Sequence, residues 1–202
     1  MSAEGFSIPR IGRFIKENAL LLSLVPIMIV GGTLVHEFAH YVSVKAEGGT
    51  VMSVDLFPSR GDFRLGEVRW LPQGDENRPL IAMAPTVVWT TMALGTAGVA
   101  RWILAPDTSS RIALMIGFFL PIADASLGAS GLFCHASASD WSIAFRGHEP
   151  VIAVLFALYV TLFGEIGLRL FRRCWGPDVL SPWEYTALYV VALALPWLRQ
   201  LF

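Results

Sequence analysis

A short stretch of the chain, His36-Glu37-Phe38-Ala39-His40, has the spacing H-E-x-x-H. Residues four apart on a helix lie on one face, one turn apart, so both imidazoles can reach the same metal ion. Zinc lowers the pKa of a bound water to about 7, and a carboxylate beside it can accept the proton as the hydroxide attacks a carbonyl. The pattern therefore predicts zinc-dependent hydrolysis, with His36 and His40 as ligands and Glu37 as the catalytic base.

Two observations favour a functional role for this motif. With 4 histidines in 202 residues, random placement would produce an H-E-x-x-H only about 0.003 times in such a chain. The motif also lies inside an apolar segment, where ionisable side chains are costly and usually serve a function. The alternative is a structural role, in which the three polar side chains form hydrogen bonds between helices.

The composition predicts that these residues lie in a membrane protein. Hydrophobic residues make up 54% of the chain and charged residues 15%, whereas soluble domains have about 25% charged residues. A soluble domain of this size could not bury so much apolar surface, so we expect the lipid bilayer to be its solvent. The net charge of −1 and the lack of a basic block exclude nucleic acid as a partner.

Five apolar segments approach the length of about 20 residues that is needed to cross a hydrocarbon core. They cover about residues 18–44, 80–104, 111–133, 151–173 and 183–202. The first continues past any plausible cleavage site, which indicates an uncleaved span rather than a signal peptide. We therefore expect an all-α, multi-pass integral membrane protein, located in the cell membrane, with residues 1–202 forming a single domain.

Residues 50–71 differ from these segments. Apolar and polar residues partly alternate over residues 51–56 and 63–70, and Pro58-Ser59-Arg60-Gly61-Asp62 between them has the composition of a turn. This pattern predicts a β-hairpin at the membrane surface, just after the segment that contains the H-E-x-x-H motif. An irregular amphipathic loop is the alternative.

The motif in an early apolar segment, followed by Gly48-Gly49, a hairpin and further spans, resembles the site-2 protease-like family of intramembrane zinc metalloproteases, in its small, divergent branch. The resemblance covers about residues 18–173. It implies one zinc ion per chain, histidine ligands at His36 and His40, a catalytic acid/base at Glu37 and an aspartate as the third ligand. It also implies a membrane-protein or peptide substrate, cleaved in or next to the bilayer.

Two aspartates compete for the position of third ligand. The family's common form, Asn-x-x-Pro followed by Asp-Gly, is missing, because the corresponding stretch is Phe118-Phe119-Leu120-Pro121 without either element. Ser139-Asp140-Trp141 before a new span is similar to the Ser-Asp form of the divergent branch, so we expect Asp140. Asp124, at a depth similar to that of His36, is the alternative ligand or a partner of a ligating imidazole. His135 and Glu165 are further candidates.

Two other functions remain open at the level of sequence. In a different class of membrane zinc peptidase the third ligand is a glutamate, which would require Glu165 or Glu184. A catalytically silent relative of the family would keep the fold and act as a membrane binding or regulatory protein. The presence of Glu37 favours an enzyme, because a purely structural metal site does not need this carboxylate.

Overall fold

The computed structural model of the protein describes residues 7–56, 66–71, 78–102, 111–112, 114–132, 139–145, 148–176 and 178–198. The elements in chain order are α1 (Ile8–Glu17), α2 (Ala19–Leu22), α3 (Val25–Ala46), β1 (Thr50–Asp55), β2 (Glu67–Leu71), α4 (Arg78–Trp102), η1 (Met115–Phe119), α6 (Leu120–Gly128), η2 (Ala129–Leu132), α7 (Asp140–Ala144), α8 (Glu149–Trp175) and α9 (Pro182–Leu198). The fold is thus mostly helical with one small sheet.

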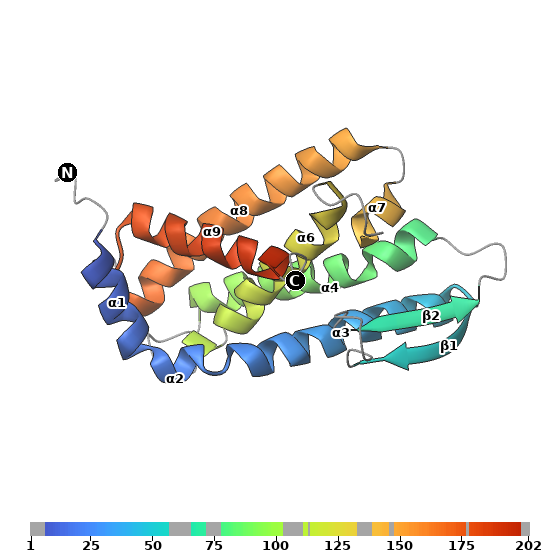
Figure 1. The fold of residues 1–202 in the computed structure, drawn as a ribbon, viewed down its shortest axis with the longest axis horizontal. Coiled ribbons are helices and arrows are strands. Elements are labelled where there is room, and N and C mark those ends of the chain that lie inside the picture. The colour runs from blue at the N-terminus through green and yellow to red at the C-terminus, as the bar shows by residue number, and fades with distance from the viewer. Residues whose placement is uncertain are drawn as a thin grey trace.

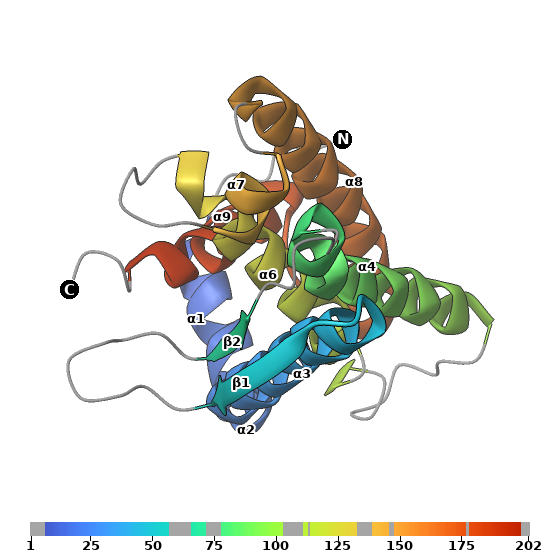
Figure 2. The ribbon, with the colours of Figure 1, turned by 90° about the vertical axis from the view of Figure 1, so that its right-hand side faces the viewer.

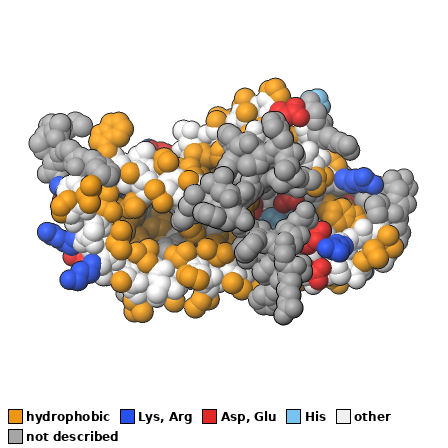
Figure 3. Space-filling model, viewed as in Figure 1, with side chains coloured by type: hydrophobic (Ala, Val, Ile, Leu, Met, Phe, Trp, Pro, Cys, Tyr) orange, Lys and Arg blue, Asp and Glu red, His pale blue; other side chains and the backbone are white. Residues whose placement is uncertain are grey.

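Three helical segments are long and apolar enough to cross a membrane, namely Ala19–Ala46, Arg78–Val99 and Glu149–Trp175. The long helices α3, α4 and α8 in these segments run along the length of the molecule, with α3 antiparallel to the other two (Figure 1). Their outward faces carry exposed apolar side chains, including Phe38, Val87 and Leu158, and apolar side chains spread over the whole length of one face (Figure 3). These segments correspond to three of the five spans that the sequence predicts.

Within the described residues, the other two predicted spans do not form single helices long enough to cross a membrane. The segment expected over 111–133 contains the π-helical turn η1, then α6, then the 3₁₀ turn η2, rather than one uninterrupted helix. Pro121 explains the change from the π-helical turn η1 to α6, because proline has no N–H for the helical hydrogen bonds and its ring crowds the preceding turn. The last segment forms α9, which has 17 residues.

Helix α6 lies in the middle of the molecule, with α3, α4, α8 and α9 around it (Figure 2). Seven of its nine residues are buried. Because of this central position, side chains of α6 can contact α3 and α4 directly, and Leu120 of α6 packs with Met28 of α3 and Trp89 of α4. The short helix α7 packs mainly on α4. Helices α3, α4, α6 and α7 therefore converge at one place.

The predicted hairpin is confirmed as an antiparallel pair of strands, β1 and β2, in which Thr50 pairs with Leu71 and Asp55 with Glu67. The turn predicted between them, and the expected start of the second strand at residue 63, lie outside the described residues. Gly48 ends the preceding helix with a φ of +80°, a conformation that glycine adopts readily. The chain therefore turns sharply after α3 and brings the hairpin back over the second half of that helix (Figure 1).

Candidate metal centre

His36 and His40 lie on successive turns of α3, as the spacing predicts. Their Nε2 atoms are 3.2 Å apart, and only 8% of the surface of His40 is exposed. The Nδ1 atom of His40 lies 2.9 Å from the carbonyl oxygen of Ile81 on α4. A carbonyl can only accept a hydrogen bond, so this contact places the proton of His40 on Nδ1 and leaves the Nε2 lone pair directed at the position that the two rings share.

Asp140 joins these histidines from a distant part of the chain. It is the first residue of α7, and the side chain of Ser139 before it caps this helix by accepting a hydrogen bond from the backbone N–H of Ser142. One carboxylate oxygen of Asp140 lies 3.2 Å from Nε2 of His36 and 3.5 Å from Nε2 of His40. His36, His40 and Asp140 thus form a group that could hold a metal ion.

The spacing of the three atoms can be compared with that of a zinc site. Zinc ligands lie about 2.0–2.2 Å from the ion in a tetrahedral arrangement, so two of them are separated by about 3.3 Å. The separations in this group are 3.2, 3.2 and 3.5 Å. Two imidazoles and one carboxylate are also a known ligand set of catalytic zinc, which leaves the fourth position for water. The donor atoms and their spacing therefore fit a metal ion such as zinc.

Asp124, the alternative ligand, occupies a different place. It is buried on α6, and one of its carboxylate oxygens lies 2.5 Å from Nδ1 of His36, on the side of the ring opposite the metal-facing nitrogen. Asp124 therefore acts as the hydrogen-bond partner of a candidate ligand, and it does not belong to the group of three. Such contacts orient the ring and set which nitrogen carries the proton.

The remaining candidate ligands do not belong to this group. Glu165 on α8 is exposed and forms an ion pair with Arg169 at 2.7 Å. Glu184 is fully buried at the start of α9, where it accepts hydrogen bonds from the backbone N–H groups of Ser7 and Ser181. His135 lies outside the described residues.

Glu37 is buried, with 5% of its surface exposed, and lies under the hairpin. The residue above it is Gly66, immediately before β2. A Cβ atom at this position would come within 2.6 Å of Cγ and Oε1 of Glu37, so only glycine allows the backbone to approach the carboxylate this closely. No motif in the sequence marks Gly66 as part of the site. A lone glycine within a strand-like pattern is nevertheless a known sign of close backbone approach.

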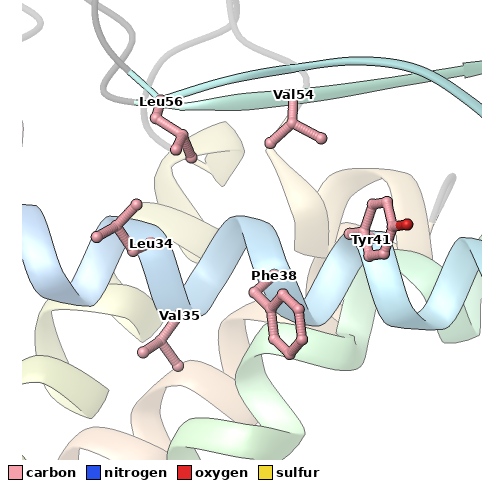
Figure 4. A pocket seen from close by; sticks show the side chains of 6 residues that line it. All are labelled: Leu34, Val35, Phe38, Tyr41, Val54 and Leu56. Atoms are coloured by element: carbon pink, nitrogen blue, oxygen red, sulfur yellow. The ribbon is translucent and has the colours of Figure 1, made fainter.

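An apolar cavity of about 600 Å³ lies between α3 and β1. Val54 and Leu56 point from the strand toward the helix, which contributes four side chains (Figure 4). These are Leu34, Val35, Phe38 and Tyr41. Figure 3 shows that histidine and acidic side chains reach the surface together in a recess of the molecule.

Comparison of the chain with protein-family models, curated proteins and solved structures finds no match. The resemblance to the site-2 protease-like family therefore rests on the motifs of this sequence.

Proposed function

We propose that the protein is a multi-pass membrane zinc metalloprotease that hydrolyses peptide bonds in or next to the bilayer. The observation that supports this proposal best is the convergence of two imidazole nitrogens and one carboxylate oxygen at the spacing of zinc ligands. A second carboxylate, that of Glu37, directly follows the candidate ligand His36 in the chain. A catalytic site needs both features, because the ligands position an ion and the carboxylate moves a proton.

Each residue has a defined role in this proposal. His36, His40 and Asp140 hold the zinc ion, which when bound lowers the pKa of a water molecule and polarises a carbonyl group. Glu37 would accept a proton from the attacking water molecule while the oxygen of that water forms a bond to the carbonyl carbon of the substrate. Glu37 then returns the proton to the amine nitrogen as the carbon–nitrogen bond breaks. Asp124 keeps the His36 ring in the orientation in which Nε2 is free to bind the ion.

The substrate we propose is a segment of a membrane protein or a peptide in an extended conformation. A helical substrate must first unwind, because its carbonyl groups are already hydrogen-bonded. The cavity between α3 and β1 is lined by apolar side chains and suits those of such a segment. An edge of the hairpin would pair with the extended backbone by β-strand addition. If proline substitutions along β1 and β2 leave cleavage unchanged, strand addition is wrong.

The first test measures bound zinc per chain in detergent-purified protein. We expect about one zinc ion in the wild type and in Glu37→Gln, and a large loss in His36→Ala and Asp140→Asn. Asp124→Asn should bind zinc more weakly, by about 10- to 100-fold in affinity, and should not lose the site. If Asp124→Asn loses zinc completely and Asp140→Asn does not, the assignment of the third ligand is wrong.

The second test measures cleavage of a membrane-embedded peptide by the same preparations. Activity in the wild type that disappears in Glu37→Gln supports the protease. A wild type that binds zinc and cleaves no peptide in a library of transmembrane segments would instead support a membrane binding or regulatory protein. If both Asp124 and Asp140 can be replaced by alanine without loss of activity, while Glu165 or Glu184 is essential, the other class of zinc peptidase applies.

A further inference from the structure

We propose that Thr86 and Trp141 are positioning residues for the metal centre, and that they connect the ligands His36 and Asp140 through one directed chain of hydrogen bonds. This inference rests on the zinc site of the proposed function. Neither residue belongs to the group of ligands. Both are buried where α4, α6 and α7 meet, with 7% of Thr86 and 2% of Trp141 exposed.

The first link of the chain joins α7 to α4. The Nε1 atom of Trp141 lies 2.9 Å from the hydroxyl oxygen of Thr86. An indole N–H can only donate a hydrogen bond, so the Thr86 oxygen is the acceptor here. The hydroxyl proton of Thr86 therefore remains available for a different partner.

The second link joins α4 to α6. The hydroxyl oxygen of Thr86 lies 3.5 Å from a carboxylate oxygen of Asp124, which is the acceptor in this pair. The other carboxylate oxygen of Asp124 lies 2.5 Å from Nδ1 of His36. Asp124 thus meets a donor on each carboxylate oxygen, and its contact with His36 holds the proton of that ring on Nδ1. The Nε2 lone pair of His36 is then free for the metal.

The other end of the chain is covalent, because Trp141 directly follows Asp140. The indole of Trp141 makes edge-on contacts with the rings of Phe156 and Tyr159 of α8. Gly128 at the end of α6 makes room for it, since a Cβ there would come within 2.6 Å of the indole. The buried indole therefore anchors the first turn of α7, and with it the carboxylate of Asp140.

The two ends of the chain meet at the candidate metal position. From His36 the path runs through Asp124, Thr86 and Trp141 to Asp140, whose carboxylate lies 3.2 Å from Nε2 of His36. Four segments, α3, α6, α4 and α7, are thereby connected around one point. Loss of a link in the middle would leave a buried polar group without its partner, and would loosen both ligands at once.

The test is the zinc affinity of the full chain, measured by competition with a chelator of known affinity. Thr86→Val keeps the shape of the side chain and removes the hydroxyl, and we expect it to weaken zinc binding by about 10- to 100-fold. Thr86→Ser keeps the hydroxyl and should bind zinc nearly as the wild type does. Thr91→Val is the matched control, because Thr91 is an exposed threonine of the same helix whose hydroxyl bonds to the Val87 carbonyl.

Trp141→Phe removes the N–H group and keeps an aromatic ring, and should weaken zinc binding in the same way. Thermal unfolding of the metal-free variants identifies any variant that fails to fold. Wild-type zinc affinity in folded Thr86→Val would overturn the inference, as would a wild type that binds no zinc. A wild type that binds zinc but cleaves no peptide overturns only the proposed function, because the comparison of affinities does not depend on activity.

Discussion

Glu37, the carboxylate that we propose as the catalytic base, differs in its role from the histidines His36 and His40. It is buried beneath the backbone at Gly66 and is not part of the group that could hold a metal ion. We therefore expect Glu37→Gln, which has nearly the same shape, to keep the zinc content of the wild type. Cleavage should fall by about 100- to 10,000-fold, because the amide cannot accept the proton of water. Comparison of zinc content and cleavage rate in the same sample checks this, and a variant that loses zinc would contradict it.

Gly66 provides a second prediction at the level of the residue. In Gly66→Ala the new methyl group would meet the Glu37 side chain at 2.6 Å, so the carboxylate or the start of β2 must shift. A displacement of about 1 Å at a reacting group can lower a rate by about 100-fold. We expect slower cleavage with unchanged zinc content.

The control for this substitution is Gly95→Ala on α4, where a Cβ would meet no atom within 4 Å. Equal activity of the two variants would mean that the close approach of the hairpin to Glu37 has no role in catalysis.

Among the elements, α1 is tied to the far end of the chain by one buried carboxylate. Glu184 at the start of α9 accepts a hydrogen bond from the backbone N–H of Ser7 at 2.9 Å and from that of Ser181 at 2.8 Å, and Arg10 lies 3.7 Å away. Removal of this acceptor leaves the buried N–H of Ser181 without a partner, at a cost of about 1–3 kcal/mol, and also the partly buried N–H of Ser7. Glu184→Ala should therefore lower the thermal unfolding temperature. Zinc binding should stay unchanged, since α1 lies at the end of the molecule that is remote from the candidate metal centre (Figure 1).

The same contacts of Glu184 predict that the stability of the fold depends on pH. Burial raises the pKa of Glu184, but the N–H donors of Ser181 and Ser7 and the charge of Arg10 outweigh it and lower this pKa below its ordinary value. A lowered pKa means that Glu184 stabilises the fold above its unfolded pKa of about 4.3, and that this contribution is lost as the pH falls toward the folded value.

Unfolding temperatures measured from pH 7 down to pH 3 for the wild type and Glu184→Gln test this dependence. The difference between the unfolding temperatures of the two proteins should become smaller below about pH 4.3. A constant difference over the whole range would show that the charge of Glu184 does not contribute.

At the scale of the whole molecule, the outward faces of the long helices are apolar. Leu162 lies near the middle of α8, with 55% of its surface exposed, which is the environment of a side chain in contact with lipid. A charged residue at the centre of a spanning helix costs about 2.5–3.5 kcal/mol on insertion. Leu162→Asp should therefore lower the fraction of protein that resists alkaline extraction from membranes. Ile8→Asp is the control, because Ile8 is exposed on α1, outside the three candidate spans.

The features that the sequence determined by itself are local ones. The spacing of His36 and His40 places both imidazoles on one face of any helix. This follows from the period of the helix alone and does not depend on contacts with other segments. The apolar composition likewise predicts long membrane helices, because hydropathy is a property of each segment. The hairpin could be predicted from the alternation of apolar and polar residues and from the turn residues between them.

Only the tertiary structure decided which groups meet. The choice between Asp140 and Asp124 depends on how α7 packs against α4, and the residue that sets this packing, Trp141, contacts Thr86 at a separation of 55 positions in the chain. The role of Gly66 depends equally on where the hairpin lies over Glu37. Contacts between segments arise from the burial and hydrogen bonding of side chains that are far apart in sequence, so no local pattern in one segment can specify its partner in another.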